Sequence, residues 1–284
     1  MEGVPLDFRP NLWVVLKDFI QRAINGELHL PPWWLRDIGG AEDFEAVGQE
    51  FLTLFVQLAQ LKPDEQVLEI GCGSGRMALP LTTFLRPPGS YTGTDIVAPF
   101  IAWCQKHISR RRPQFAFLHA DLYNQRYNPQ GRWLASEYTF PFPDERFDFV
   151  FLTSVFTHLL PKDTEHYLHE IRRLLRPNGR CLATFFLLNE TQARLAAEGK
   201  NEIAFRYGSD PIRIRSETVP ESAVAYDEAY LLDLLSQCGL TLQAPIYYGS
   251  WSGRADGLSY QDILLFRRAD NDADGADGVN ETNV

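Results

Sequence analysis

A glycine-rich turn constrains the fold of this chain more than any other segment. Residues 67–76 read Val-Leu-Glu-Ile-Gly-Cys-Gly-Ser-Gly-Arg. A short apolar run closed by glycines is typical of a buried parallel strand. Glycines allow the unusual dihedral angles of a tight turn and the close approach of a ligand, and a helix that follows offers free N–H groups. The segment therefore predicts a strand–turn–helix unit that binds a ligand.

Apolar runs and amphipathic segments alternate beyond this turn. The predicted order is helix 76–85, strand 91–96, helix 97–109, strand 115–119, strand 147–153, helix 163–175 and strand 181–188. Such alternation implies right-handed βαβ crossovers and a mainly parallel sheet. Strands at 242–248 and 260–267 follow a helix at 227–238, and their connection is too short for a crossover helix, so they should pair antiparallel. The predicted fold is α/β, a doubly wound sheet in three α-β-α layers with an antiparallel C-terminal strand, plus N-terminal helices.

We expect three parts along the chain. Residues 1–62 form an N-terminal helical cap packed on the core, with a helix at 11–24 whose apolar residues share one face. Residues 63–269 form the main domain. Within it, residues 189–222 show little periodicity and are predicted to be a substrate-binding insertion after a strand's C-terminal end. Residues 270–284 are predicted to be a disordered acidic tail.

Charge and cysteine usage narrow the function classes. The formal net charge is -10, and five of the acids lie in residues 270–284. A mildly acidic folded part argues against a duplex nucleic-acid partner, which calls for a basic face. No two of the four cysteines form a close pair, so we expect free thiols and no metal. No signal peptide or spanning helix is evident, so a cytoplasmic protein with no membrane association is expected.

The spacing of the turn discriminates between cofactor classes. Dinucleotide-binding turns follow G-x-G-x-x-G, whereas this turn is G-x-G-x-G with Arg76 at the place of the third dinucleotide glycine. An acid precedes it, Glu69. A carboxylate there would repel a pyrophosphate and attract a cation, so the ammonium group of a nucleoside that carries an amino acid fits.

At these residues the chain resembles the class I S-adenosylmethionine (SAM)-dependent methyltransferases, which have a Rossmann-like fold. The family's first motif, acid-x-G-x-G-x-G, matches residues 69–75, and further family segments resemble 91–96, 117–122, 143–150 and 174–180. The resemblance implies that Glu69 and the glycines hold the methionine end of SAM, that Asp95 binds the ribose hydroxyls and that Ile96 packs on the adenine. The donor-binding residues implied in full are Glu69, Gly71, Gly73, Gly75, Asp95, Ile96, Asp121, Leu122 and Thr153.

The acceptor side is less defined by the sequence. His158 follows the fourth strand of the main domain and is the candidate general base, since a histidine there can titrate near neutral pH. Trp251 and Arg254 lie between the last two strands and are candidate acceptor contacts. We expect O- or N-methylation of a small molecule, such as a glycan or metabolite, with no metal because the sulfonium already carries the activation. An NAD(P)-dependent oxidoreductase and a non-catalytic binding module are the competing hypotheses.

Overall fold

The computed structural model describes residues 10–36 and 43–269, so the predicted tail at 270–284 lies outside the described residues. The helices are α1 (Leu12–Asn25), α2 (Trp33–Arg36), α3 (Phe44–Gln57), α4 (Ala78–Phe84), α5 (Ala98–Cys104), α6 (Pro161–Leu174), α7 (Glu190–Ala197) and α8 (Glu228–Gln237). The strands are β1 (Gln66–Ile70), β2 (Ser90–Asp95), β3 (Phe115–His119), β4 (Phe147–Leu152), β5 (Leu175–Phe185), β6 (Leu187–Leu188), β7 (Ile212–Ile214), β8 (Val224–Asp227), β9 (Leu240–Tyr247) and β10 (Asp262–Arg268). Short 3-10 or π turns are η1 (Gln105–Ser109), η2 (Ala135–Glu137), η3 (Phe156–His158), η4 (Pro220–Ser222) and η5 (Ser250–Ser252).

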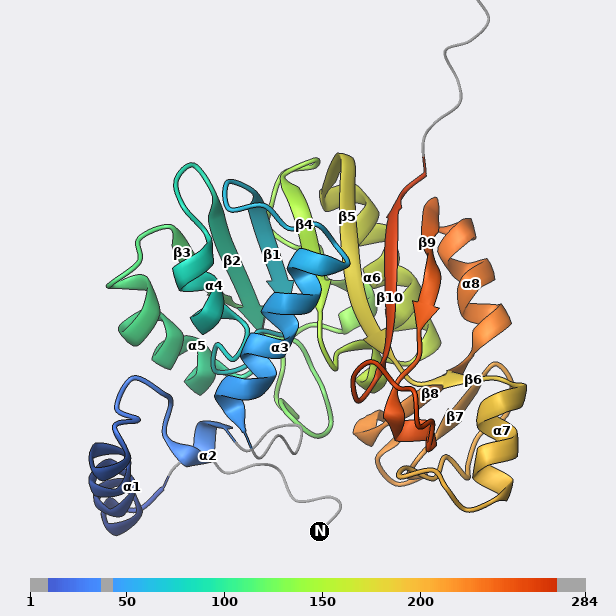
Figure 1. Ribbon diagram of the computed structural model, residues 1–284, viewed down its shortest axis with the longest axis horizontal. Helices are drawn as coiled ribbons and strands as arrows, with labels where there is room; N and C mark the ends of the chain where they lie inside the picture. The colour runs from blue at the N-terminus through green and yellow to red at the C-terminus, as the bar shows by residue number, and fades with distance from the viewer. Residues whose placement is uncertain (1–9, 37–42, 270–284) are drawn as a thin grey trace, which may run out of the picture.

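The central sheet has seven strands in the order β3-β2-β1-β4-β5-β10-β9 (Figure 1). The first five strands are parallel, and β10 pairs antiparallel with both β5 and β9. The Rossmann-like α/β fold predicted from the sequence, with its antiparallel C-terminal strands, is thus confirmed. Strand order reverses beside β1, where open α/β sheets bind ligands at the carboxyl ends of their strands.

Two apolar layers cover the two faces of this sheet. Val67, Phe149 and Phe151 point into a cluster with buried residues of α3, α4 and α5. Their chain neighbours Leu68 and Val150 point the other way, into a cluster with buried residues of α6 and α8. Because successive side chains of a strand face opposite sides, the nearly unbroken apolar runs seen in the sequence supply both layers.

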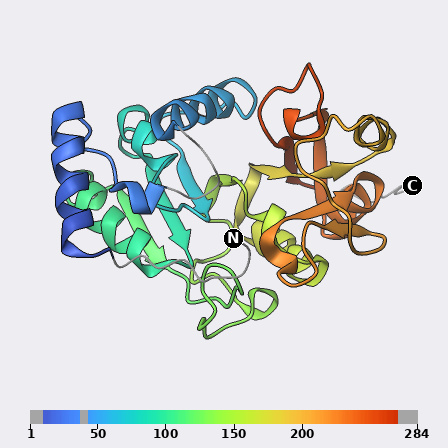
Figure 2. The ribbon, with the colours of Figure 1, turned by 90° about the horizontal axis from the view of Figure 1, so that it is seen from below.

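The segment predicted as an insertion contributes to a second, smaller sheet. β6 directly follows β5, and the three strands lie in the order β6-β8-β7. Residues 189–222 contain α7, β7 and η4, so they carry more regular structure than their weak periodicity suggests. This sheet lies below β9 and β10, beyond the carboxyl end of β5 (Figure 1), and the view from below shows this part of the chain at the end of the molecule opposite α1 (Figure 2).

The N-terminal helices behave differently from one another. Phe51 and Phe55 of α3 are buried against the main sheet. In α1, by contrast, the only buried residue is Asp18, and the apolar side chains are exposed. Of the predicted helical cap at 1–62, α3 thus packs on the main sheet, whereas the apolar side chains of α1 do not. No helix in the described ranges is long and apolar enough to cross a membrane.

Candidate functional site

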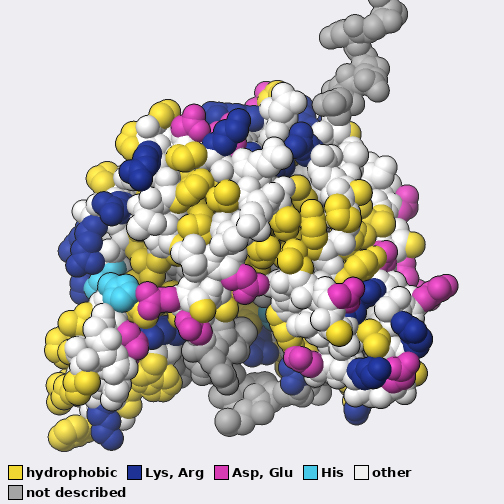
Figure 3. All heavy atoms as spheres, in the orientation of Figure 1, with side chains coloured by type: hydrophobic (Ala, Val, Ile, Leu, Met, Phe, Trp, Pro, Cys, Tyr) yellow, Lys and Arg dark blue, Asp and Glu magenta, His cyan; other side chains and the backbone are white. Residues whose placement is uncertain are grey.

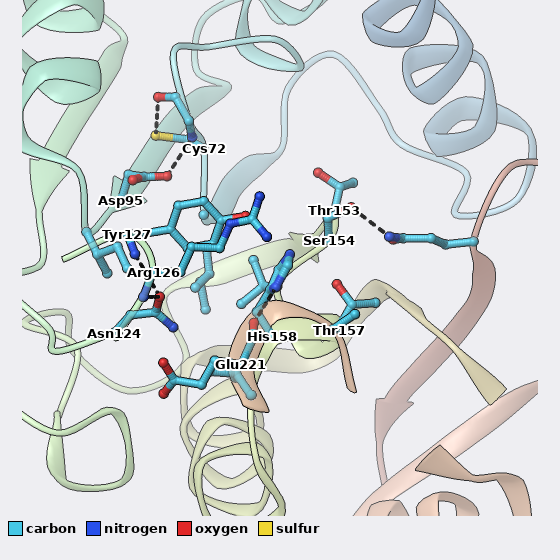
Figure 4. A pocket seen from close by; sticks show the side chains of 18 of the residues that line it. Cys72, Asp95, Asn124, Arg126, Tyr127, Thr153, Ser154, Thr157, His158 and Glu221 are labelled. Carbon is cyan, nitrogen blue, oxygen red and sulfur yellow. Dashed lines mark hydrogen bonds between the residues drawn. The ribbon is translucent and has the colours of Figure 1, made fainter. Parts of the chain in front are cut away.

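A cavity of about 1320 Å³ opens at the carboxyl ends of the parallel strands (Figure 4). Its lining includes the residues that end or follow β1, β2, β3 and β4, namely Ile70, Asp95, Ala120 and Thr153. On one side it is closed by α3 and the end of α2, and on the other by the 202–223 part of the insertion. It therefore lies where the fold predicts a ligand, and it is large enough for a nucleoside with a second small molecule.

The three glycines of the turn differ in what a side chain at each position would contact. Gly71 has a φ of +82°, and a Cβ there would lie 2.3 Å from Val155 Cγ2, so this glycine allows close packing. Gly75 has a φ of +87° and packs against Ile108 without lining the cavity. Gly73 has a φ of +52°, lines the cavity, and has no heavy atom within 4 Å of a Cβ placed on it. Gly73 is thus the position of the turn that leaves space for a ligand.

Glu69 lies at the floor of the cavity on β1. It is 1% exposed, and the hydroxyl of Tyr91 on β2 donates a hydrogen bond to its Oε2. Burial raises the pKa of Glu69 to about 8, while the hydrogen bond from Tyr91 lowers it and the nearby Asp95 raises it further. Glu69 is therefore a desolvated carboxyl group whose charge a cationic ligand would stabilise.

Asp95 ends β2 and faces the same cavity. Its two oxygens accept hydrogen bonds from the backbone N–H of Gly73 at 2.7 Å and of Val97 at 2.8 Å. Burial raises the pKa of Asp95 to about 6, and these two backbone hydrogen bonds oppose the rise. Each oxygen retains a lone pair, so the carboxylate is fixed in orientation and still able to accept from a ligand hydroxyl.

The remaining predicted donor residues divide into two groups. Ile96, Leu122 and Thr153 line the cavity together with Asp95 and Glu69. Asp121 does not line it: its Oδ1 accepts a hydrogen bond from Asn128 Nδ2 at 3.2 Å. The Asp121 side chain is thus held within the loop after β3, apart from the other residues expected to bind the methyl donor.

The residues present fit a donor such as SAM. Two carboxyl groups with raised pKa values, that of the buried Glu69 and that of the half-buried Asp95, share one cavity with Arg76 and with the open backbone at Gly73. SAM carries an ammonium, a sulfonium, a carboxylate and two ribose hydroxyls, which are the groups this set can bind. Among residues 10–36 and 43–269 no cluster of His, Cys, Asp or Glu has the composition of a metal site.

His158 ends η3 and borders the other half of the cavity. Its Nδ1 donates to the carbonyl oxygen of Glu221 at 2.8 Å, because a carbonyl can only accept, so in the neutral ring Nε2 carries the lone pair. Burial lowers the pKa of His158 to about 4, against the raising effect of that hydrogen bond. Burial thus moves the pKa of His158 below the neutral range expected from the sequence.

The loop after β3 brings residues to the cavity that sequence reasoning missed. Asn124 Oδ1 accepts from the backbone N–H of Arg126 at 3.1 Å and of Tyr127 at 3.0 Å, a turn that an asparagine favours. The turn sets the Tyr127 ring edge-to-face with His158 at 5.4 Å between centroids. Glu221 Oε2 accepts from the backbone N–H of Gln125 at 2.7 Å and so fastens this loop to the insertion. The sequence indicates a turn at Asn124, because asparagine favours turns. It does not indicate that this loop contacts the insertion at Glu221.

Trp251 and Arg254 lie away from the cavity. Trp251 is completely buried, its Nε1 donates to Asp262 Oδ2 at 2.8 Å, and its ring packs on Phe186 at 5.0 Å. The guanidinium of Arg254 lies over the ring of Tyr248 at 4.1 Å. Neither residue lines the cavity, so their predicted direct contact with an acceptor is not supported. Trp251 instead supports Phe186, which does line it.

The fold and the cavity together define a class: an α/β protein that binds a nucleoside ligand at the glycine turn after β1. A family described as "Methyltransferase domain" matches residues 68–183. Residues 68–183, less than half of the chain, are thus similar to a methyltransferase domain, and S-adenosyl-L-methionine is the methyl donor of that class.

Curated relatives match the chain over part of their length. A tRNA N(3)-cytidine methyltransferase from Gallus gallus is 30% identical over 125 residues, which cover 41% of this chain and 29% of that protein. A 27-O-demethylrifamycin SV methyltransferase from Amycolatopsis mediterranei is 26% identical over 144 residues, which cover 49% of this chain and 45% of that protein. The chain thus spans between a quarter and a half of the length of these two relatives.

Solved structures share the fold at low sequence identity. A protein of Pyrococcus horikoshii superposes with a TM-score of 0.55 at 16% identity, covering 82% of this chain and 94% of that one. The 1,6-didemethyltoxoflavin-N1-methyltransferase of Burkholderia thailandensis superposes with a TM-score of 0.51 at 18% identity, covering 94% of this chain and 95% of that one. Its structure contains 1,6-didemethyltoxoflavin and S-adenosylhomocysteine.

Proposed function

We propose that this protein transfers the methyl group of SAM to an oxygen or nitrogen atom of a small-molecule acceptor. The observation that carries this proposal is the continuous cavity that joins the glycine turn to the insertion, with the carboxyl groups of Glu69 and Asp95 at one end and His158 at the other. When bound, SAM supplies a methyl group on a sulfonium that is already activated for in-line displacement. The chain's own contribution is proximity and alignment, which can account for about 7–11 kcal/mol of a barrier.

In the donor half, we assign each ionic group a partner. Glu69 binds the ammonium group of SAM, and its proton leaves when the cation arrives. Arg76, which lines the cavity near Glu69, binds the carboxylate. Asp95 accepts from the ribose hydroxyls, and Ile96 and Leu122 pack on the adenine. Arg76 at the end of the glycine turn also favours a methyl donor over a dinucleotide, because it replaces the glycine that dinucleotide turns place there.

In the acceptor half, His158 orients the nucleophile. Its Nε2 accepts a hydrogen bond from the acceptor's hydroxyl or amine, while Nδ1 remains bound to the carbonyl of Glu221. With a pKa of about 4 the ring is neutral at pH 7, so it is ready to accept but is a weak base. Tyr127 and Arg126 complete the wall beside it.

Charge supports a small acceptor over a polynucleotide. The chain has a net charge of -10, and the lining of the cavity mixes acids with arginines and is not a basic stripe. A polyanionic strand calls for a basic surface, so this lining favours a smaller acceptor. Because one relative is named for tRNA methylation and another for a rifamycin, the two acceptor classes form the two arms of the test.

The test is incubation of the protein with methyl-labelled SAM and either a metabolite extract or total tRNA. We expect label in a small-molecule fraction, and its loss in Glu69→Gln and His158→Ala variants. Label in tRNA alone would replace the small-molecule acceptor with RNA.

A thermal-shift panel with SAM and NAD(P) distinguishes a methyltransferase from an oxidoreductase and from a binding module. Only a ligand that binds the native state stabilises it, so we expect SAM to raise the melting temperature and NAD(P) to leave it unchanged. Stabilisation by NAD(P) and not by SAM would indicate an oxidoreductase. Stabilisation by SAM without transfer of label in either extract would indicate a binding module.

A further inference from the structure

The apolar face of α1 is turned to solvent. We call the α1 face the exposed side chains of Leu12, Val15, Leu16, Phe19, Ile20 and Ile24, which recur at the three-to-four spacing of one side of a helix. Phe19 is 53% exposed and Ile24 is 74% exposed. Trp13, beside this face, is 74% exposed. A contiguous apolar surface of this kind marks a site of interaction.

Polar contacts of the opposite side fix α1 in this orientation. Asp18 is 4% exposed, and it accepts a hydrogen bond from the backbone N–H of Trp33 at 2.9 Å and from Arg22 Nε at 2.7 Å. Arg22 also donates to the carbonyl oxygen of Leu30 at 3.0 Å. Rotating the apolar residues inward would break this buried pair and leave Asp18 unsatisfied. The exposure of the α1 face is therefore built into the local structure.

Positive charge lies next to the α1 face. Four exposed cations lie in or directly after η1: Lys106 within it, and Arg110, Arg111 and Arg112 in the turn to β3. None of these four has an ion pair with an acid in the described part of the chain. α5, which continues directly into η1, lies above α1 at the same edge of the molecule (Figure 1). Figure 3 shows hydrophobic side chains gathered over α1, with Lys and Arg side chains along the same edge above them.

We propose that the α1 face and the basic residues at 106–112 form a surface that binds anionic lipid bilayers. An amphipathic helix flanked by lysine and arginine buries its apolar side at the boundary of headgroups and acyl chains, while the cations attract anionic lipid. α1 has 14 residues and is about 21 Å long, shorter than the ~30 Å hydrocarbon core, so it would lie in the interface and not cross it.

A bilayer fits this surface better than a second copy of the chain. Two copies joined through the α1 face would each bring the same unpaired cations to the contact, and like charges repel. Of the nearby acids, Glu27 forms an ion pair with Arg36, so its charge is compensated within that pair. An anionic lipid surface complements both the apolar and the charged part.

The test is co-sedimentation of the full-length protein with two kinds of vesicle. One kind contains phosphatidylcholine alone and the other contains phosphatidylcholine mixed with phosphatidylserine. We expect sedimentation with the mixed vesicles, weakened by salt. Phe19→Asp or Ile24→Asp should weaken it by about tenfold or more. Arg110→Gln and Arg111→Gln should weaken it by about fivefold for each charge removed, on the anionic vesicles only.

Leu258→Asp is the matched control. Leu258 is 46% exposed between β9 and β10, outside the α1 face, and its replacement should leave sedimentation unchanged. Far-UV circular dichroism checks that every variant is folded. Absence of binding to the mixed vesicles, or an equal loss in Leu258→Asp and Phe19→Asp, would overturn the proposal. A dimer that Phe19→Asp dissociates, with no vesicle binding, would assign the surface to a second copy instead.

Discussion

The hydroxyl of Tyr91 donates a hydrogen bond to the carboxyl group of Glu69 beneath the glycine turn. The two residues stand on adjacent parallel strands, where Val67 pairs with Tyr91 and Glu69 pairs with Gly93. A Cβ on Gly93 would lie 2.7 Å from the Tyr91 oxygen, so the absence of a side chain at Gly93 makes room for this contact. The floor of the SAM site is thus the buried carboxyl group of Glu69, which accepts one hydrogen bond from a neutral hydroxyl. Its other lone pairs can accept hydrogen bonds from a cation.

The first prediction concerns pH and stability. The pKa of Glu69 is raised by burial from 4.5 to about 8, so the native state holds a proton that the unfolded chain has already lost. The contribution of this proton to the free energy of unfolding is complete below pH 4.5. It falls by about 1.4 kcal/mol per pH unit above that and is lost as pH rises through 8. The pKa of Asp95 is about 6, so above pH 6 its titration no longer changes the stability. Between pH 6 and pH 8 the melting temperature of the ligand-free protein should therefore fall because of Glu69. Glu69→Gln should flatten this slope, and an unchanged slope would show that Glu69 is ionised in the native state.

The second prediction separates the two acids by ligand. Hydrogen bonds to charged groups contribute about 1.5–3 kcal/mol, so Glu69→Gln should weaken SAM binding by about 10- to 150-fold. Adenosine lacks the ammonium group, so its affinity should not change in this variant. Asp95→Asn should weaken the binding of SAM and adenosine alike, because both carry the ribose. Calorimetric titration of each ligand into each variant measures these affinities, and equal losses for adenosine in both variants would contradict the assignment.

The third prediction uses two glycines of the turn. Gly71→Ala places a methyl group 2.3 Å from Val155 Cγ2 at a positive φ, so it should destabilise the fold. Gly73→Ala meets no protein atom within 4 Å and incurs mainly the cost of its positive φ, about 1–2 kcal/mol. We expect Gly73→Ala to stay folded but to lose SAM affinity, because its methyl group enters the cavity. Thermal unfolding with and without SAM distinguishes the two effects; a Gly73→Ala protein that binds SAM normally would place the donor elsewhere.

The fourth prediction concerns His158. His158→Ala should lower turnover while the dissociation constant for SAM changes little, because the ring borders the acceptor half of the cavity. Since the pKa of His158 is about 4, its protonation should affect the rate only in acid, and the pH–rate profile should lack a histidine limb between pH 6 and 8. His166→Ala is a matched control, because His166 bonds to the Tyr138 carbonyl and does not line the cavity. Unchanged turnover in His158→Ala would remove this residue from the reaction.

The fifth prediction concerns Trp251. Trp251→Ala removes a fully buried ring and should destabilise the protein by about 3–5 kcal/mol. Trp251→Phe keeps part of the ring packing but loses the hydrogen bond to Asp262, so it should lower the free energy of unfolding by about 1 kcal/mol. Leu258→Ala in the same connection should stay within about 0.5 kcal/mol of the parent. Chemical denaturation measures all three, and a higher KM for the acceptor with unchanged stability would restore Trp251 as a direct contact.

The sequence determined the parts of the protein that depend on local order. Apolar runs followed by glycines, and the acids Glu69 and Asp95 at strand ends, sufficed to predict the parallel sheet and a cavity that these two acids share, because the strand ends of a parallel sheet meet at one edge. The helix start at Asp227 was also readable, since its side chain accepts from the N–H of Tyr230 as an N-cap does.

Tertiary structure alone decided what depends on contacts between distant segments. The contact of His158 with the Glu221 carbonyl spans 63 residues and, with burial, sets a pKa that the residue type does not suggest. Trp251 lies in a connection between two strands, and the sequence does not show that it is buried. Its contacts with Asp262 and Phe186 form only in the folded chain. For α1, the apolar periodicity is real, but the Asp18–Arg22 pair turns that face outward. Periodicity specifies which side chains share a face, whereas the direction of that face depends on the free energy of contacts formed only in the folded chain.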